Sequence, residues 1–266
     1  MAALLRVRET GRRLTLTLDD PHRQNALSAE MVAAIGDTLD RAPPGLAALI
    51  VEGGGGVFSA GADLKSLSEA LAKPVPPGAI DPLLAFSVAG GRFFARFAAL
   101  PFVTVAVVDG AAVGGGMGLA AAADIVIATG RARFMLAETS LGLPPAQIAP
   151  YLVARLGERV ARRLALTGAR LDGQDAAALG LADLYCEGES ERDMKLESLL
   201  QAVERCAPGA NAETKRLLAA CRTLSPEAYV EAAAKRFAEA LRGPEGREGL
   251  AAFAEKRAPS WTRGTA

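Results

Sequence analysis

The sequence predicts an α/β fold with a helical C-terminal extension. Three observations support that class. Short apolar runs alternate with helical apolar patterns over the first two thirds of the 266 residues. The pattern after Cys206 is helical alone. Half of the residues are apolar, which is enough for one large core in a chain of this length.

The chain opens with a predicted hairpin and a helix. Leucines alternate with threonines over Leu14–Leu18, which indicates a strand with one buried face, and Leu4–Arg8 is its expected partner. Ser28 is a suitable N-cap for the helix that follows, in which apolar residues recur at helical spacing from Met31 to Leu39. A pair of prolines then ends this helix.

Buried strands are expected at Ala47–Val51 and Val57–Ser59, with four glycines between them. The segment 66–82 holds four prolines and mixed polarity, which indicates a mobile loop, and a helix should run from about Pro82 to Leu100. The later expected elements are a fully buried strand at Phe102–Val108, a glycine-rich turn at 110–118 that opens an alanine-rich helix, a strand at 124–128, and helices from about Gln147 with breaks at Gly168, Gly173 and Gly180.

Charge and histidine content exclude several classes of function. Thirty basic residues balance thirty acidic ones, so the chain has no electrostatic footprint for a nucleic acid or an anionic membrane. His22 is the only histidine, which rules out a multi-histidine metal site and leaves one candidate for a serine triad. We therefore expect no metal, no nucleic-acid partner and no membrane partner.

Cysteine use and hydropathy indicate a soluble, cytoplasmic protein. The three cysteines form no metal or disulfide motif, so we expect free, mostly buried thiols. The apolar start of the chain is too short for a signal peptide before Arg6 interrupts it. The apolar runs on either side of Asp109 are shorter than the roughly 20 residues of a membrane span.

The stretch with the most unusual chemistry is a run of three glycines, Gly114–Gly116, between a buried strand and a helix. Amides at the start of a helix point outward at the positive end of its dipole, so they stabilise an anion or a developing oxyanion. Tight packing of the helix on the sheet is the structural alternative. Residues 116–121 also match the dinucleotide pattern GxGxxA, a weak signal for a nicotinamide or flavin site.

Two further stretches carry candidate groups. The small-residue turn Ser59–Ala62 follows a strand and exposes more backbone amides, with Asp63 as an N-cap. Glu138 is the only charged residue between Arg133 and Arg155. A carboxylate in apolar surroundings tends to have a raised pKa, as a general acid or base requires. A structural role also fits each of these two stretches when it is taken alone.

The three stretches, in this order and spacing, resemble the crotonase (enoyl-CoA hydratase/isomerase) superfamily. The likeness covers nearly the whole chain, through 18–28, 60–63, 109–116, 138–142, 166–171 and 253–257. It implies a crotonase-like spiral of ββα units, with a core over residues 1–205 that holds CoA and the active site. Residues 206–266 would form a C-terminal helical trimerisation region, in a homotrimer or a hexamer built as a dimer of trimers.

The resemblance also implies roles for single residues. The amides of Ala62 and Gly115 would form an oxyanion hole for the thioester carbonyl, and Glu138 would be the catalytic acid and base. The substrate would be an acyl-CoA thioester, so no separate cofactor is expected. Phe253 and Lys256 match positions that reach the CoA of a neighbouring subunit. The residues implied in binding CoA and substrate are Arg23, Asn25, Ala26, Ala60, Ala62, Asp63, Leu64, Gly114, Gly115, Phe253 and Lys256.

One position departs from the pattern of well-studied hydratases. They carry a second glutamate two residues after the triple glycine, where this chain has Gly118. Members with a single glutamate include enoyl-CoA double-bond isomerases and hydratases of branched glutaconyl-CoA thioesters. Residues 142–150, together with 117–119, are most similar to the second group, the isohexenylglutaconyl-CoA and 3-methylglutaconyl-CoA hydratases.

The function predicted from the sequence is therefore hydration of a 2-enoyl-CoA, of a branched glutaconyl type, by a hydro-lyase. A double-bond isomerase with the same site is the main alternative; a non-catalytic acyl-CoA-binding relative and a dinucleotide-dependent oxidoreductase are further ones. Arg92, Arg96 and Gln147 are candidates for binding the distal carboxylate of a glutaconyl group. A solvated helix face is the other interpretation of the two arginines.

Overall fold

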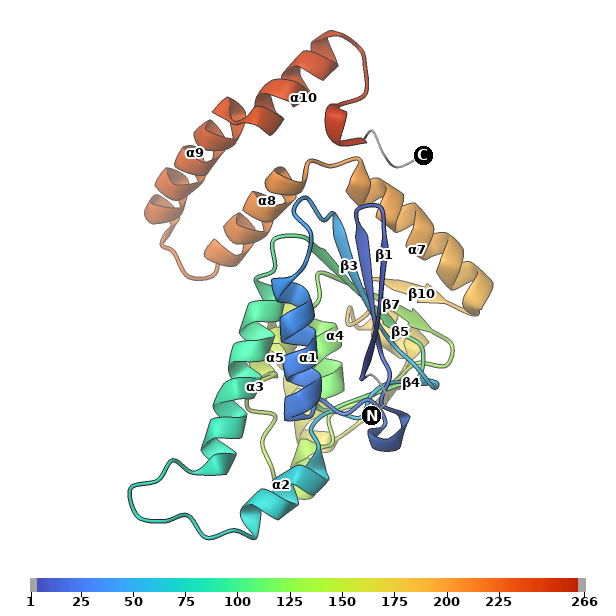
Figure 1. The fold of residues 1–266 in the computed structure, drawn as a ribbon, viewed down its shortest axis with the longest axis vertical. Helices are drawn as coiled ribbons and strands as arrows, with labels where there is room; N and C mark the ends of the chain where they lie inside the picture. Colours follow the sequence, from blue (N-terminus) through green and yellow to red (C-terminus); the bar gives the residue numbers. More distant parts are fainter. Residues whose placement is uncertain (1–3, 263–266) are drawn as a thin grey trace.

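Two β-sheets form the centre of the molecule and helices cover them, within residues 4–262, which the computed structural model describes (Figure 1). The strands are β1 (Leu5–Thr10), β2 (Arg13–Leu18), β3 (Ala48–Gly53), β4 (Val57–Ser59), β5 (Val103–Val108), β6 (Ala111–Val113), β7 (Ile125–Thr129), β8 (Arg133–Met135), β9 (Arg170–Asp172) and β10 (Leu184–Cys186). The helices are α1 (Ala29–Asp40), α2 (Leu64–Leu71), α3 (Pro82–Ala98), α4 (Gly115–Ala122), α5 (Ala149–Thr167), α6 (Gly173–Ala178), α7 (Glu189–Glu204), α8 (Pro208–Ala220), α9 (Pro226–Arg242) and α10 (Pro244–Ala254). Short 3-10 turns are η1 (Pro21–Arg23), η2 (Glu138–Leu141) and η3 (Ser260–Thr262).

The chain alternates between the two sheets. The larger sheet has the strand order β1-β2-β3-β5-β7-β10, and the smaller one has the order β4-β6-β8-β9. Strands β3, β5 and β7 are parallel neighbours in the first sheet, and β4, β6 and β8 are parallel neighbours in the second. A helix follows β4 and β6, and α5 follows β8 after η2. The predicted spiral of ββα units is therefore confirmed.

Most elements predicted from apolar periodicity are present. Strands β1 and β2 form the expected hairpin, paired from Leu5↔Leu18 to Thr10↔Arg13, and its tight turn uses Gly11 at φ +57°. The Ser28 hydroxyl caps α1 by accepting a hydrogen bond from the amide of Met31 at 3.2 Å.

The structure corrects the predicted boundaries in two ways. The supposed mobile loop 66–82 begins as helix α2, because the Asp63 carboxylate caps it by accepting from the amides of Lys65 and Ser66. Four strands of three residues were not predicted: β6 lies between Gly110 and the triple glycine, β8 precedes Glu138, and β9 and β10 interrupt the expected helical region. Such short strands exist because distant segments pair with them.

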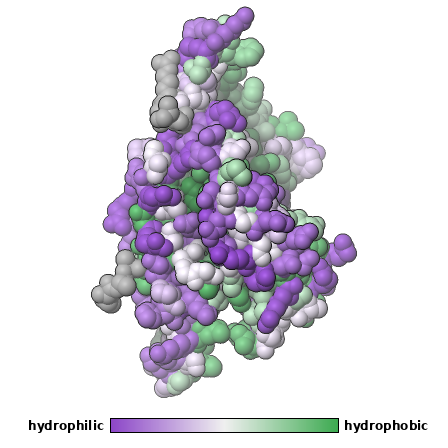
Figure 2. All heavy atoms as spheres, turned by 90° about the vertical axis from the view of Figure 1, so that its right-hand side faces the viewer, coloured by the Kyte–Doolittle hydropathy of each residue, from purple (hydrophilic) through white to green (hydrophobic). Residues whose placement is uncertain are grey.

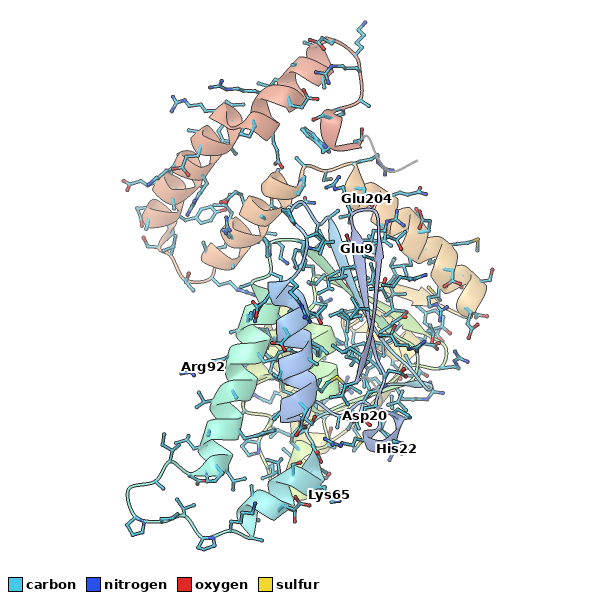
Figure 3. The ribbon with its side chains drawn as sticks, in the orientation of Figure 1. Glu9, Asp20, His22, Lys65, Arg92 and Glu204 are labelled. Carbon is cyan, nitrogen blue, oxygen red and sulfur yellow. The ribbon has the colours of Figure 1, made fainter. Side chains whose placement is uncertain are left out.

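The larger sheet has apolar residues packed on both of its faces. One cluster joins residues such as Leu16 and Val108 to Met31 of α1 and Phe97 of α3. A second, smaller cluster packs Ile50 and its neighbours against α7. Arg13 fixes α7 at its outer end, because the guanidinium pairs with Glu204 at 2.6 Å and with Glu197 at 2.6 Å. Figure 3 shows Glu204 beside the β1–β2 hairpin.

The C-terminal helices extend away from the two sheets (Figure 1). Helix α8 is anchored to them, since Lys215 Nζ lies 2.6 Å from Asp124 Oδ2 and 2.9 Å from the carbonyl oxygen of Phe102. Helices α9 and α10 carry exposed apolar side chains, and apolar surface lies among charged side chains at this end of the molecule (Figure 2). These side chains are Val230, Phe237, Leu241, Leu250 and Phe253. A role of residues 206–266 in oligomerisation stays a prediction.

Hydropathy and the cysteines complete the comparison with the sequence. Among residues 4–262 no helix is both long enough and apolar enough to cross a membrane. All three cysteines are free, as expected. Only Cys186 is buried, however, so the expectation of mostly buried thiols is wrong for Cys206 and Cys221.

Candidate active site

The three candidate catalytic positions follow the ends of adjacent parallel strands. Ala62 comes three residues after β4, Gly115 two residues after β6, and Glu138 three residues after β8. Since β4 pairs with β6 and β6 with β8, the carboxyl ends of these strands meet at one edge of the smaller sheet. The topology therefore brings together the groups that the sequence singled out in three separate stretches.

Glycines let the first two segments approach each other without side chains between them. A Cβ on Gly61 would lie 2.5 Å from the carbonyl oxygen of Val113 and 2.9 Å from the amide nitrogen of Gly115, and the φ angle of Gly61 is +86°. A Cβ on Gly116 would lie 2.3 Å from the carbonyl oxygen of Ser59. Close approach of two backbones thus explains why these positions are glycine.

Two backbone amides are left pointing away from their own segments. The carbonyl oxygen of Gly61 accepts from the amide of Leu27 at 2.7 Å, and that of Gly114 accepts from the amide of Gly118 at 2.9 Å. In a trans peptide the N–H points opposite to the C=O, so the amides of Ala62 and Gly115 face the other way. Within the part of the chain that the structure describes, neither amide has a hydrogen-bond acceptor. Both are thus available to an oxyanion.

Glu138 lies beside this pair of amides. Its Oε1 is 2.6 Å from the point where a Cβ on Gly114 would stand. Its Oε2 is buried and has no hydrogen-bond partner among residues 4–262. Burial raises the pKa of the Glu138 carboxyl, and the residue's own backbone N–H opposes that shift only in part. A carboxyl group with a raised pKa beside two unpaired amides has the properties of a general acid and base.

The position of a second carboxylate is closed. A Cβ on Gly118 would lie 2.2 Å from Cγ2 of Ile148, which is buried at the start of α5. The sequence identified Gly118 as a departure from the hydratase pattern, but it offered no signal that Ile148 fills the space beside it.

The loop before α1 is held to the site by Asn25. This side chain is 1% exposed, its Oδ1 accepts from the amide of Asp20, and its Nδ2 donates to the carbonyl oxygens of Gly54 and Val57. The Ser59 hydroxyl donates to the carbonyl oxygen of Asn25 at 2.7 Å. The Asn25 side chain therefore joins this loop to β4, a structural role that the sequence did not reveal. Its predicted contact with CoA, and that of the buried Ala26, stay predictions.

Arg23 and Asp63 form an ion pair at the rim of the same region. Arg23 Nη1 lies 3.5 Å from Asp63 Oδ2 and 3.2 Å from Glu30 Oε2. Burial acts to raise the pKa of Asp63, but the Ser66 hydroxyl, the capped amides and Arg23 outweigh it and hold the pKa low. Leu64 is exposed directly after Asp63, and Ala60 is held by its amide, which donates to Gln24. Their roles toward CoA also stay predictions.

Other predicted residues lie apart from the amides and Glu138. Phe253 and Lys256 belong to the α10 end of the molecule, opposite to α2 (Figure 1). Phe253 is 84% exposed, and contact with a neighbouring subunit's CoA stays a prediction. His22 is exposed on η1 (Figure 3), and no role in this site follows for it.

The three candidates for a distal carboxylate differ in position. Arg92 points outward from α3 (Figure 3), and Arg96 is paired with Asp40 of α1 at 2.6 Å, so the solvated-face interpretation fits both arginines. Gln147 instead turns toward α3. Its Nε2 donates to the Ser87 hydroxyl at 3.0 Å, and a Cβ on Gly91 would lie 2.3 Å from its Oε1.

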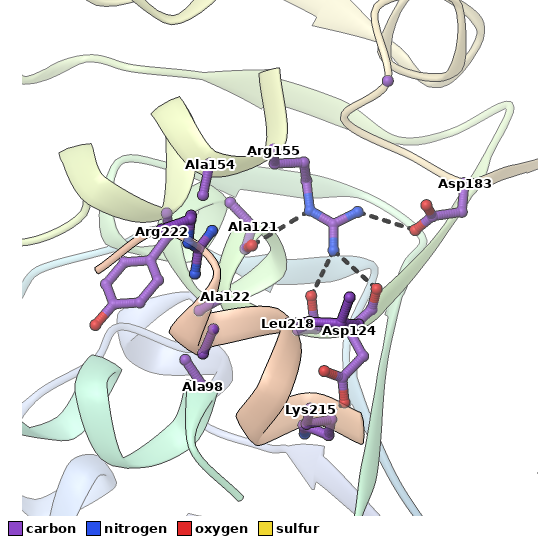
Figure 4. Close-up of a pocket in the computed structure, with 14 residues that line it drawn as sticks. Ala98, Ala121, Ala122, Asp124, Ala154, Arg155, Asp183, Lys215, Leu218 and Arg222 are labelled. Carbon is purple, nitrogen blue, oxygen red and sulfur yellow. Dashed lines mark hydrogen bonds and ion pairs between the residues drawn. The ribbon is translucent and has the colours of Figure 1, made fainter. Parts of the chain in front are cut away.

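A cavity of about 430 Å³ with a mixed polar and apolar lining lies at the C-terminal end of α4 (Figure 4). Arg155 lines it and pairs with Asp183 at 2.9 Å, and it also donates to backbone carbonyl oxygens, including that of Asp124. The Asp124 carboxylate is paired with Lys215. Two ion pairs and the side chain of Arg222 therefore lie where α4, α5 and α8 meet.

The fold and the site define a class: a two-sheet ββα spiral with two unpaired backbone amides and a neighbouring carboxylate. The enoyl-CoA hydratase/isomerase family matches residues 13–264. A crystal structure of an enoyl-CoA hydratase/isomerase from Marinobacter aquaeolei superimposes with a TM-score of 0.93 at 38% identity, covering 98% of this chain and 99% of that one. Pseudomonas aeruginosa AtuE gives a TM-score of 0.91 at 40% identity, covering 98% and 100% of the two chains.

A curated relative extends the comparison beyond solved structures. Carnitinyl-CoA dehydratase of Salmonella typhi is 31% identical over an alignment that covers 98% of this chain and 99% of that protein. The chain therefore belongs to the enoyl-CoA hydratase/isomerase family. It is an enzyme of the hydratase type, a hydro-lyase, and it has the fold of that family.

Proposed function

We propose that this protein adds water across the double bond of a 2-enoyl-CoA thioester, with Glu138 as the acid and base. The observation that carries the proposal is the position of the Glu138 carboxylate against Gly114, next to the unpaired amides of Ala62 and Gly115. Two amides polarise a thioester carbonyl, and they stabilise the negative charge that its oxygen gains as an enolate forms.

The proton transfers follow from the same arrangement. Glu138 takes a proton from the water whose oxygen bonds to Cβ of the acyl group. The proton that completes the addition is delivered from the carboxyl group to Cα, so the product gains one water in total. Burial supports both steps, because it moves the pKa of Glu138 towards neutral pH, where one carboxyl group can both accept and donate a proton.

The acyl group is the finer part of the proposal. We infer a branched glutaconyl group from the similarity of residues 117–119 and 142–150 to hydratases of that type. Gln147 supports it, since its amide and the Ser87 hydroxyl form a polar pair that suits a distal carboxylate. One relative, carnitinyl-CoA dehydratase, is named for a different acyl group. An assay with several thioesters is therefore needed to identify the acyl group that this enzyme accepts.

One panel of thioesters tests the function and the acyl group together. Crotonyl-CoA, 3-methylglutaconyl-CoA, isohexenylglutaconyl-CoA and a 3-enoyl-CoA are incubated with the protein, and product masses are measured. We expect addition of one water, fastest with a branched glutaconyl thioester. Glu138→Gln should lower kcat by about 10²–10⁴-fold, whereas the exposed Glu158→Gln should not. Near-wild-type turnover of Glu138→Gln would refute the mechanism.

A double-bond isomerase is the second candidate, and the closed position beside Gly118 favours it. Moving a proton between two carbons needs one base and no bound water, which a site with a single carboxylate provides. Reaction in H₂¹⁸O separates the two candidates, since hydration places heavy oxygen in the product and isomerisation does not.

Binding of CoA at subunit contacts forms a separate proposal. Phe253 and Lys256 would contact the CoA of a neighbouring subunit in a homotrimer or a hexamer, in the cytoplasm. Support comes from the exposure of both side chains, which lie in and directly after α10, at the end of the molecule that extends from the sheets. Light scattering would give the number of subunits, and Phe253→Ala should raise KM for the thioester if the contact exists.

A further inference from the structure

Ile148 takes the volume beside Gly118 in which a second carboxylate would stand. A Cβ on Gly118 would lie 2.2 Å from Cγ2 and 2.7 Å from Cβ of Ile148. Both residues are buried, and Ile148 is 4% exposed. No side chain fits at position 118 unless the backbone moves or Ile148 is replaced.

The same side of α4 also holds Glu138. Gly114 and Gly118 are four residues apart and are joined by the hydrogen bond from the Gly118 amide to the Gly114 carbonyl. Positions at this spacing are neighbours on one side of a helix, about 5.4 Å apart along its axis. Glu138 lies against Gly114 and Ile148 lies against Gly118, so the apolar side chain and the carboxylate are about one helical turn apart along α4.

Ile148 is held in place from two further directions. The preceding residue, Gln147, lies over Gly91 and bonds to Ser87 of α3. The following residues begin α5, where the amides of Tyr151 and Leu152 donate to the Ile148 carbonyl oxygen. Contacts with α3 and with the first turn of α5 therefore hold this segment in place and keep Ile148 against Gly118 of α4.

We propose that Ile148 is a positioning residue that makes Glu138 the only base of this site. It excludes a second carboxylate from position 118, so one carboxyl group performs both proton transfers. This inference rests on the proposed role of Glu138. It predicts that Ile148 controls the hydration of the carboxyl group and, through it, the pH at which the enzyme becomes active.

Few charged groups compete with this control. Helix α4 has no titratable side chain. On α5, the ring of Tyr151 lies 6.0 Å from that of Phe94, and Arg155 is paired with Asp183. On β8, Arg133 donates to the carbonyl oxygens of Gly130 and Ala132. Burial is therefore the influence on the pKa of Glu138 that a substitution can change most directly.

A stability cycle tests the contact without reference to activity. Gly118→Ala and Ile148→Gly are compared with the double variant by thermal unfolding. Glycine is the required partner, because alanine at 148 would keep its Cβ 2.7 Å from the new one. Each single variant should lower Tm, and the double variant should lose less than the sum. Additive losses would show that the two side-chain positions do not compete, and they would overturn the proposal.

The pH profile of kcat/KM tests the positioning role. In Ile148→Ala, water reaches the carboxyl group, so the acidic limb should move to lower pH, while Ile148→Val should keep the wild-type limb. Leu152→Ala is the matched control, since Leu152 is also buried, one turn along α5, and its loss should lower Tm without moving the limb. An unmoved limb in Ile148→Ala would overturn the proposal. If instead Glu138→Gln retains full turnover, the proposed function fails, whatever the outcome of the stability cycle.

Discussion

The Glu138 carboxylate occupies the space in which a side chain of Gly114 would stand: Glu138 Oε1 lies 2.6 Å from the position that a Cβ of Gly114 would occupy. Gly114 also joins β6 to α4, and its peptide orients the amide of Gly115. One glycine therefore sets the separation between the Glu138 carboxylate, the proposed acid and base, and the amide of Gly115, a donor of the proposed oxyanion hole.

Gly114→Ala should consequently impair catalysis more than folding. Its φ of +51° disfavours any side chain, by about 1–2 kcal/mol, and the new methyl group would displace the carboxylate. We expect kcat to fall by about 10²-fold or more, the cost of losing a hole donor. Gly78→Ala is the matched control, because Gly78 has φ +79° and nothing lies within 4 Å of its Cβ position. Equal turnover of the two variants would contradict this prediction.

Glu138→Gln should change the pH dependence of stability. Burial raises the pKa of Glu138 above its ordinary 4.5, so the folded protein binds this proton more tightly than the unfolded chain does. The stabilisation from that proton is complete below pH 4.5 and is lost as pH rises through the raised pKa. The neutral glutamine avoids this loss. Thermal unfolding from pH 4 to 8 should show Glu138→Gln gaining on the wild type as pH rises, with the exposed Glu158→Gln as baseline; a gain that grew in acid would contradict the assignment.

Asn25→Ala should destabilise the fold by about 2–5 kcal/mol. The substitution removes the partner of the buried Asp20 amide, whose loss costs about 1–3 kcal/mol, and of the partly buried carbonyl oxygens of Gly54 and Val57, whose loss costs less because water can reach them. Urea unfolding measures the difference. Asn211→Ala provides the control, since Asn211 lies in α8 and its side chain makes no hydrogen bond within residues 4–262. A loss no larger than that of Asn211→Ala would mean that water replaces all three bonds.

Arg13→Ala should also be strongly destabilising. Glu204 is 4% exposed, and removal of Arg13 leaves its charge buried without a partner, which typically costs about 3–5 kcal/mol. Adding Glu204→Gln to Arg13→Ala should recover part of that loss. Breaking the exposed Arg162–Glu158 pair should cost less than about 1 kcal/mol by the same urea measurement. Similar costs for the two pairs would contradict the burial argument.

The comparison with the sequence shows which parts of a fold periodicity reveals. Strand β2 and helices α1 and α3 each bury regularly spaced apolar residues, so their apolar spacing identifies them. Strand β6 has three residues, too few to show a period, and it exists because β4 and β8 pair with it. The proline-rich segment concealed α2 because its helix signal is one cap, Asp63, ahead of a mostly exposed helix.

The site divides in a similar way. The sequence singles out Glu138 because one charge in a long apolar stretch is unusual, and the glycine run singles out the amide of Gly115, whereas their catalytic roles stay predictions. The resemblance supplied the pairing of Ala62 with Gly115, which lies beyond any local pattern because it depends on the neighbouring ends of β4 and β6. Ile148 was not identifiable, since an isoleucine at a helix start gives no sign of which glycine it covers.

Both donors of the proposed oxyanion hole are main-chain amides, and this affects what mutation can do to them. Every residue except proline carries a backbone N–H, so of the nineteen possible replacements at Ala62 only one removes the donor outright. Mutations can therefore change the acyl specificity and the proton chemistry around Glu138 one residue at a time, whereas nearly all substitutions at Ala62 keep the backbone donor of the proposed oxyanion hole.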